Sequence, residues 1–151
     1  MVLRLTALIF AFLFLPGVAS AAPADDATAI VEQWVAAFNA SDVDKIIATY
    51  TSDASVHGTL APNLAIGTDS LRAYFTPVTR ARNQVKMDSN GTATTLSPDH
   101  VVLAGFYEFS GTRADGQAFT APARYTFVLV RRDGAWRIAH HHSSPRPRPA
   151  Q

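Results

Sequence analysis

Between residues 25 and 50, apolar positions recur with the spacing of helices. Asp25 or Asp26 can cap a first helix, and Ser41 or Asp42 can start a shorter second one that runs to Tyr50. The apolar residues of the first helix share one face: Ile30, Val31, Trp34, Val35 and Phe38. Those of the second are Val43, Ile46 and Ile47. The pattern predicts two helices that share a core-facing stripe.

A third helix and one short strand are predicted before the pattern changes. The strand covers residues 54–58 and ends at a glycine. The helix starts at Thr68 or Asp69 and stops near Pro77 or a few residues later, because proline removes a backbone donor. Its apolar face consists of Leu71, Tyr74, Phe75 and Val78.

From about Gln84 the chain is rich in branched and aromatic residues, as strands are. The segments HVVLAGFYEFSG and AFTAPARYTFVLV are joined by the turn RADGQ, and RRDGAW turns the chain again into WRIAHHHS. Helices followed by a long antiparallel meander predict an α+β fold: a strongly curved antiparallel sheet with three helices from the N-terminal half packed on its concave face.

The N-terminus has the pattern of an export signal. A basic start precedes an apolar run that is too short for a comfortable membrane span, and small residues follow. We expect residues 1–21 to be a signal peptide cleaved near Ala21, so that the mature protein is periplasmic or secreted and has no membrane segment. We assign residues 22–143 to one folded domain. Residues 144–151, rich in proline and arginine, are expected to form a flexible tail.

Charge and composition exclude several classes of partner. The chain has 13 basic and 12 acidic residues, so no nucleic-acid partner is expected. It has no cysteine, which excludes disulfides and lipid attachment through a thiol. Neither a dinucleotide fingerprint nor a flavin motif is present, so no cofactor is expected.

The order of elements and three motifs, YTSDASVHGTLAP, IGTDSLRAYF and ARYTFVLVRRDGAWRIAHHHSSPRP, resemble the nuclear transport factor 2-like superfamily with its SnoaL-like cone. Within it, the chain is most similar to the group of the calcium/calmodulin-dependent protein kinase II association domain, which includes bacterial SgcJ/EcaC-type proteins. The resemblance implies a cone with a deep pocket between helices and sheet, and self-association through the outer face of the sheet. It also places Gly58 where ketosteroid isomerases have their aspartate base, which argues against that mechanism here.

The face of the last strand that lines this pocket depends on the turn at Asp133 and Gly134. A two-residue turn would pair Arg124 with Ser143. A three-residue turn, with a bulge at Gly134, would pair Arg124 with His142 instead. We favour the second, because it places Arg124, His140 and His142 at the polar mouth of one apolar base. That base would consist of Trp136, Ile138, Val128 and Val130.

The favoured register has two further consequences. The opposite face would carry an exposed aromatic strip suited to a second copy of the chain: Tyr125, Phe127 and Leu129. If the RADGQ hairpin is centred near Gly116, Glu108 falls opposite Arg124 and can pair with it at the pocket. The alternative for Glu108 and Arg124 is an ordinary cross-strand ion pair on a wet face.

The functional hypothesis concerns the histidines. His140 and His142 share one strand face and His141 points the other way. As a pair they can be structural, can bind an anionic or carbonyl group together with Arg124, or can ligate a metal with His57 as a third ligand. Because no metal motif supports the last interpretation, no metal is expected.

The expected function is that of an exported, self-associating domain that binds a small organic ligand, one that can be anionic, with little or no catalysis. Candidate ligand-binding residues are Arg124, His140, His142, His57, Tyr50, Tyr74 and Tyr107. The alternative is a cofactor-independent acid/base enzyme of isomerase, cyclase or dehydratase type. Its candidate catalytic residues are His140, His142 and Glu108.

Overall fold

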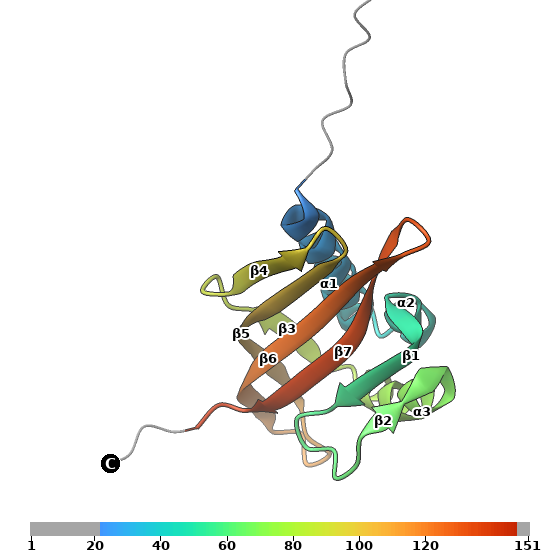
Figure 1. Ribbon diagram of the computed structural model, residues 1–151. Helices are drawn as coiled ribbons and strands as arrows, with labels where there is room; N and C mark the ends of the chain where they lie inside the picture. Colours follow the sequence, from blue (N-terminus) through green and yellow to red (C-terminus); the bar gives the residue numbers. More distant parts are fainter. Residues whose placement is uncertain (1–21, 148–151) are drawn as a thin grey trace, which may run out of the picture.

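The computed structural model describes residues 22–147 as three helices packed against one curved, seven-stranded sheet (Figure 1). The helices are α1 (Pro23–Asn39), α2 (Val43–Ala48) and α3 (Gly67–Arg80). The strands are β1 (Tyr50–His57), β2 (Ala65–Ile66), β3 (Gln84–Met87), β4 (Thr92–Ser97), β5 (His100–Thr112), β6 (Ala118–Arg132) and β7 (Ala135–Pro145). The α+β class is confirmed. The expected signal peptide and the last four residues lie outside the described part.

The sheet has the order β2-β1-β7-β6-β5-β3, and β4 pairs with the free half of β5. All pairs are antiparallel except β1 with β7, which run parallel. The expectation of a fully antiparallel sheet is therefore wrong for this pair. β1 and β7 are distant in sequence, so no hairpin turn fixes their relative direction.

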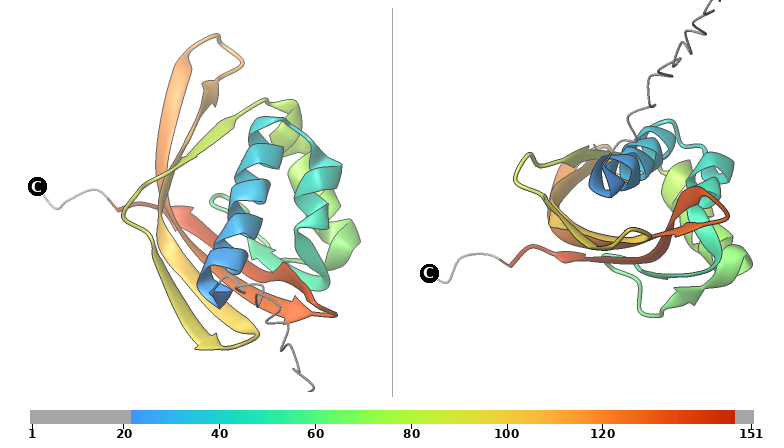
Figure 2. Two further views of the ribbon diagram at one scale, coloured as in Figure 1. Left: turned by 90° about the horizontal axis from the view of Figure 1, so that it is seen from above. Right: turned by 45° about the horizontal axis from the view of Figure 1, so that its top comes forward.

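The helices cover the concave face of the sheet, as the views in Figure 2 show. The apolar face of α1 supplies Trp34, which packs edge-on against Phe127 of β6 with ring centroids 5.5 Å apart. The ring centroid of Phe75, in α3, lies 6.4 Å from that of the same indole. These side chains are almost wholly buried, so the sheet and two of the helices share one aromatic core.

The helix boundaries follow local hydrogen bonding. The side chain of Asp42 accepts a hydrogen bond from the backbone N–H of Lys45 and caps α2, one of the two residues predicted for that role. Tyr50 was expected at the end of this helix but begins β1. The helix α3 continues through Pro77 to Arg80.

The turn between β6 and β7 differs from the favoured prediction. Arg132 pairs with Ala135, so Asp133 and Gly134 form a two-residue turn, with φ angles of 53° and 76°. The three-residue turn is therefore wrong. Leu129 pairs with Ile138 but Val128 pairs with His140, which leaves Ala139 as an extra residue in β7.

This extra residue is a β-bulge, and it exchanges the two faces of β7 beyond it. Before the bulge, Ile138 is buried on the concave face. After it, His141 and Ser143 are buried there, and His140 turns outward. Arg124 consequently pairs with Ser144, a register that neither sequence alternative contained.

The strand β7 also extends past the expected domain boundary at residue 143. It ends at Pro145, and the backbone N–H of Arg146 donates to the carbonyl of Pro122. The guanidinium of Arg146 lies over the ring of Phe106, 4.1 Å from its centroid. The first residues assigned to the tail are thus fixed on the sheet.

Candidate functional site

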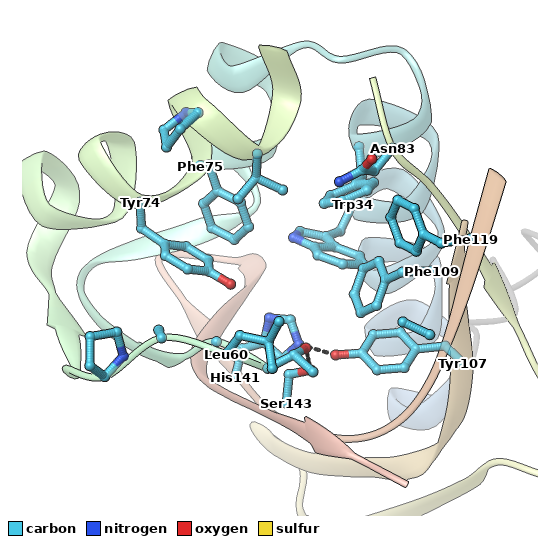
Figure 3. Close-up of a pocket in the computed structure, with 18 residues that line it drawn as sticks. Trp34, Leu60, Tyr74, Phe75, Asn83, Tyr107, Phe109, Phe119, His141 and Ser143 are labelled. Atoms are coloured by element: carbon cyan, nitrogen blue, oxygen red, sulfur yellow. Dashed lines mark hydrogen bonds between the residues drawn. The ribbon is translucent and has the colours of Figure 1, made fainter. Parts of the chain in front are cut away.

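A cavity of about 460 Å³ lies between the concave face of the sheet, α1 and α3 (Figure 3). Its wall is largely aromatic, with Trp34, Phe38, Tyr74, Phe75, Tyr107, Phe109 and Phe119. The loop after β1 contributes Gly58, Thr59 and Leu60, and β7 contributes His141 and Ser143. Among residues 22–147, no Asp, Glu, Lys or Arg side chain lines this cavity. Its size is that of a site for a small organic molecule.

His141 is the central polar group of the cavity wall. It is 3% exposed and stacks on Phe127, with ring centroids 4.0 Å apart. Its Nδ1 lies 2.9 Å from the Tyr50 hydroxyl, and its Nε2 lies 3.2 Å from the Tyr107 hydroxyl. Both ring nitrogens are therefore within hydrogen-bond distance of a tyrosine, which fixes the orientation of the imidazole.

Burial determines the ionisation of this group. Desolvation, with smaller contributions from the neighbouring His140 and His142, lowers the pKa of His141 to about 3. Burial also raises the pKa of Tyr50 well above 10.0, and raises that of Tyr107 in the same direction. At neutral pH all three groups are uncharged, so the polar part of the cavity wall is a neutral hydrogen-bonding network.

Two further features complete the polar part of the wall. The hydroxyls of Thr59 and Ser143 are hydrogen-bonded to each other beside Tyr107. The indole N–H of Trp34 has no hydrogen-bond acceptor, although the ring is 1% exposed. This N–H lies near the Tyr50 hydroxyl without reaching hydrogen-bond geometry. It slightly lowers the pKa of Tyr50, against the larger effect of burial. Figure 3 shows the indole nitrogen on the side of the ring that faces the cavity.

The residues predicted to form the pocket mouth lie outside it. Arg124, His140 and His142 project from the outer face of the sheet. The bulge at Ala139 turns His140 and His142 outward, whereas Arg124 lies on the face of β6 opposite its buried aromatic residues. Arg124 donates from Nε to Ser144 Oγ at 2.8 Å, and His140 Nδ1 lies 2.8 Å from Ser55 Oγ. The predicted inward direction of these three side chains is wrong.

His57 joins the same outer face. It pairs with His142 across the parallel strands, and the two rings are 5.8 Å apart. Three of the five histidines therefore gather on the outer face, while His141 alone lines the cavity. Within residues 22–147 no group of three or more His, Cys, Asp or Glu side chains is arranged to hold a metal ion.

The expected pair of Glu108 and Arg124 does not form. Thr112 pairs with Ala118, so the hairpin is centred one residue earlier than expected, and Glu108 lies opposite Pro122. Glu108 is exposed on the outer face and does not line the cavity. The residue opposite Arg124 on β5 is Phe106.

Of the predicted tyrosines, Tyr74 and Tyr107 line the cavity, and Tyr50 lies behind His141. The aromatic strip of Tyr125, Phe127 and Leu129, expected to be exposed, is buried on the concave face. His141, Ser143, Thr59 and Trp34 were not among the predicted site residues. The alternation of Tyr125, Phe127 and Leu129 was a signal for the inner face of β6, and it would have placed Arg124 outside.

A search for membrane-crossing helices finds no helix of sufficient length and hydropathy among residues 22–147. The family model for the calcium/calmodulin dependent protein kinase II association domain matches residues 24–147. No curated protein matches the chain.

Solved structures share the fold. A candidate calcium/calmodulin dependent protein kinase II association domain from Xanthomonas campestris is 30% identical, with a TM-score of 0.74, over 80% of this chain and 85% of that one. A ketosteroid isomerase-like protein from Erwinia carotovora is 24% identical, with a TM-score of 0.72, over 83% and 97% of the two chains. A nuclear transport factor 2-like superfamily protein from Salmonella enterica is 15% identical, with a TM-score of 0.75, over 85% and 94%.

The curved sheet, closed by three helices around an internal cavity, thus has the nuclear transport factor 2-like fold. The chain belongs to the calcium/calmodulin dependent protein kinase II association domain family. The resemblance seen in the sequence motifs is confirmed.

Proposed function

We propose that the protein binds a small, uncharged and largely aromatic molecule in the cavity between the sheet, α1 and α3. The observation that supports this is a 460 Å³ cavity lined by aromatic side chains without a single charged group. An ionised ligand would lose its hydration there without gaining a charged partner. The anionic ligand considered from the sequence depended on Arg124, which lies on the outer face. A neutral ligand therefore fits the cavity better.

Filling the cavity with a larger side chain should weaken ligand binding. Ala121 lines the cavity from β6, and Thr120 beside it is exposed on the same strand. We expect Ala121→Phe to weaken binding of the uncharged fluorescent probe N-phenyl-1-naphthylamine by at least about tenfold, because the new ring occupies the space of the probe. The matched Thr120→Phe variant should bind like the unaltered protein. Equal affinity in all three proteins, or no binding to the unaltered protein, would contradict ligand binding in this cavity.

The pKa of His141 favours ligand binding without catalytic turnover. A general base works best with a pKa near the working pH, whereas the pKa of His141 is about 3. The cavity lining also holds no carboxylate that could replace it. A ligand identified by native mass spectrometry should be recovered unchanged after prolonged incubation with the protein. Its conversion to a product would favour the acid/base enzyme instead.

We further propose that the chain associates with itself through the outer face of the sheet. In Figure 1, α1 lies behind the sheet and the opposite face of β5, β6 and β7 is left open. Val128 lies at the middle of this face, beside His140. We expect Val128→Glu to lower the mass found by sedimentation, because it places a charge in a buried contact. A monomeric mass for the unaltered protein over a wide range of concentrations would exclude this assembly.

Export is proposed from the first 21 residues, which have the composition of a cleaved signal. The intact mass of the protein recovered from the periplasm or medium of an exporting cell should correspond to a chain that starts near Ala22. A full-length mass from the cytoplasm would contradict export.

A further inference from the structure

The protons of the network of Tyr50, His141 and Tyr107 can be assigned from what each group is able to donate. A neutral imidazole has one N–H donor and one accepting nitrogen, and each tyrosine has one O–H donor. His141 Nδ1 contacts Tyr50 and Nε2 contacts Tyr107. One tyrosine must therefore donate to His141, and the other must accept from it.

The hydrogen-bond network ends at Tyr50, on the side away from the cavity. Its side chain is 6% exposed, and the hydrogen bond to His141 Nδ1 is the one its hydroxyl makes within the described residues. Its other polar neighbour, the Trp34 indole, can only donate. If Nδ1 carried the proton, the Tyr50 O–H would be buried without an acceptor, which costs more than a hydrogen bond contributes. Tyr50 therefore donates to Nδ1, and Nε2 carries the proton.

The direction of the remaining bonds follows. Nε2–H donates to the Tyr107 oxygen, so the Tyr107 proton points away from His141, toward the hydroxyls of Thr59 and Ser143 and the cavity. Thr59 and Ser143 stand beside it, and their mutual hydrogen bond uses only one of their two hydroxyl protons. Each hydrogen bond is thus donated in the direction from Tyr50 to the cavity. Two hydrogen bonds link the hydroxyls of Tyr107, Thr59 and Ser143, which have three protons, so at least one proton remains for a ligand in the cavity.

The opposite wall of the cavity also carries a hydrogen-bond donor, the hydroxyl of Tyr74. Figure 3 shows the Tyr74 hydroxyl pointing into the cavity, facing the group formed by Tyr107, His141 and Ser143. Because the lining holds no carboxylate, an occupant without acceptor atoms would leave these donors unpaired.

We propose that the cavity selects an uncharged aromatic molecule that carries a hydrogen-bond acceptor, such as a ketone carbonyl, and that the Tyr107 hydroxyl is the donor that recognises it. This proposal rests on ligand binding in the cavity and adds the chemical class of the ligand. The aromatic wall accounts for the apolar body of the ligand, and the donor at the cavity end of the network sets its orientation.

The test compares two probes of nearly equal shape, 2-acetylnaphthalene and 2-isopropylnaphthalene, in the unaltered protein and in Tyr107→Phe. We expect Tyr107→Phe to weaken the ketone by about tenfold and to leave the hydrocarbon unchanged, since only the ketone loses a hydrogen bond. The carbonyl stretching band of the bound ketone should lie at lower wavenumber in the unaltered protein than in the variant. Tyr125→Phe, which removes a hydroxyl outside the cavity lining, is the matched control and should change neither probe.

Each outcome decides a different point. Equal effects of Tyr107→Phe on both probes, with an unshifted carbonyl band, would overturn the acceptor preference and leave ligand binding intact. If neither probe binds the unaltered protein, ligand binding fails and the preference fails with it. If Tyr107→Phe does not fold, the band in the unaltered protein decides: a position typical of a carbonyl without a hydrogen bond overturns the proposal.

Discussion

Between pH 6.5 and pH 4.5 the free energy of unfolding is expected to fall by roughly 1 kcal/mol for each pH unit, because of His141 alone. In the unfolded chain this imidazole binds a proton near its ordinary pKa of 6.5, whereas in the folded protein its pKa is about 3. The unfolded state therefore binds more protons throughout this window, and stability decreases as the pH falls. This contribution levels off about one pH unit above 6.5, where the imidazole of the unfolded chain is also almost wholly neutral.

Urea denaturation as a function of pH measures this slope. His141→Gln should be less stable at pH 7 and should lose most of the slope. His140→Gln is the matched control on the outer face, where partial burial lowers the pKa to a lesser extent, so it should remove only a minor part. Asp42 and Asp53 also have lowered pKa values, but they titrate below this window. A slope that His141→Gln leaves unchanged would show that His141 is protonated in the folded protein.

The second large effect is expected at Gly58, where the cavity has no room for a side chain. A Cβ at this position would overlap the Tyr74 phenol, which lines the cavity. We expect Gly58→Ala to displace Tyr74, to destabilise the fold by about 1–3 kcal/mol and to weaken binding of the naphthylamine probe at least tenfold. Thermal unfolding and probe titration measure the two effects.

A double-mutant cycle identifies the cause. In a Tyr74→Ala background the new methyl group has space, so Gly58→Ala should then have little further effect on stability. An undiminished cost in that background would place the strain elsewhere. The same overlap supports what the sequence resemblance implied: the position that carries an aspartate base in ketosteroid isomerases cannot hold one here without rearranging Tyr74.

The fold could be predicted from the sequence because its signals are local and strong. The apolar stripe around Trp34, the Asp42 cap and the branched, aromatic run of β6 each identify an element without tertiary information. The parallel pairing of β1 with β7 could not be predicted in this way, since the two strands have no connecting turn.

The candidate site was harder to predict because one extra residue in β7, Ala139, determines which side chains of that strand face the cavity. The Asp133-Gly134 turn was recognised, but the favoured alternative placed the irregularity at Gly134, whereas the structure has it further along β7, at Ala139. Nothing in a run of Ala and His marks a bulge, because the backbone adopts it to satisfy packing on both faces. The pocket tyrosines were found because aromatic residues of the cone are core and cavity wall together, whichever register holds.

The position of the bulge determines which of the three successive histidines faces the cavity. Pairing β7 in regular register without the bulge, at the same chain length, would turn His141 outward and bring His140 and His142 inward. Deleting Ala139 would remove the bulge and keep His141 inward. In every such arrangement an imidazole would still face the phenols. A triplet of identical side chains therefore keeps an imidazole next to the tyrosines even if the last strand shifts its register by one residue.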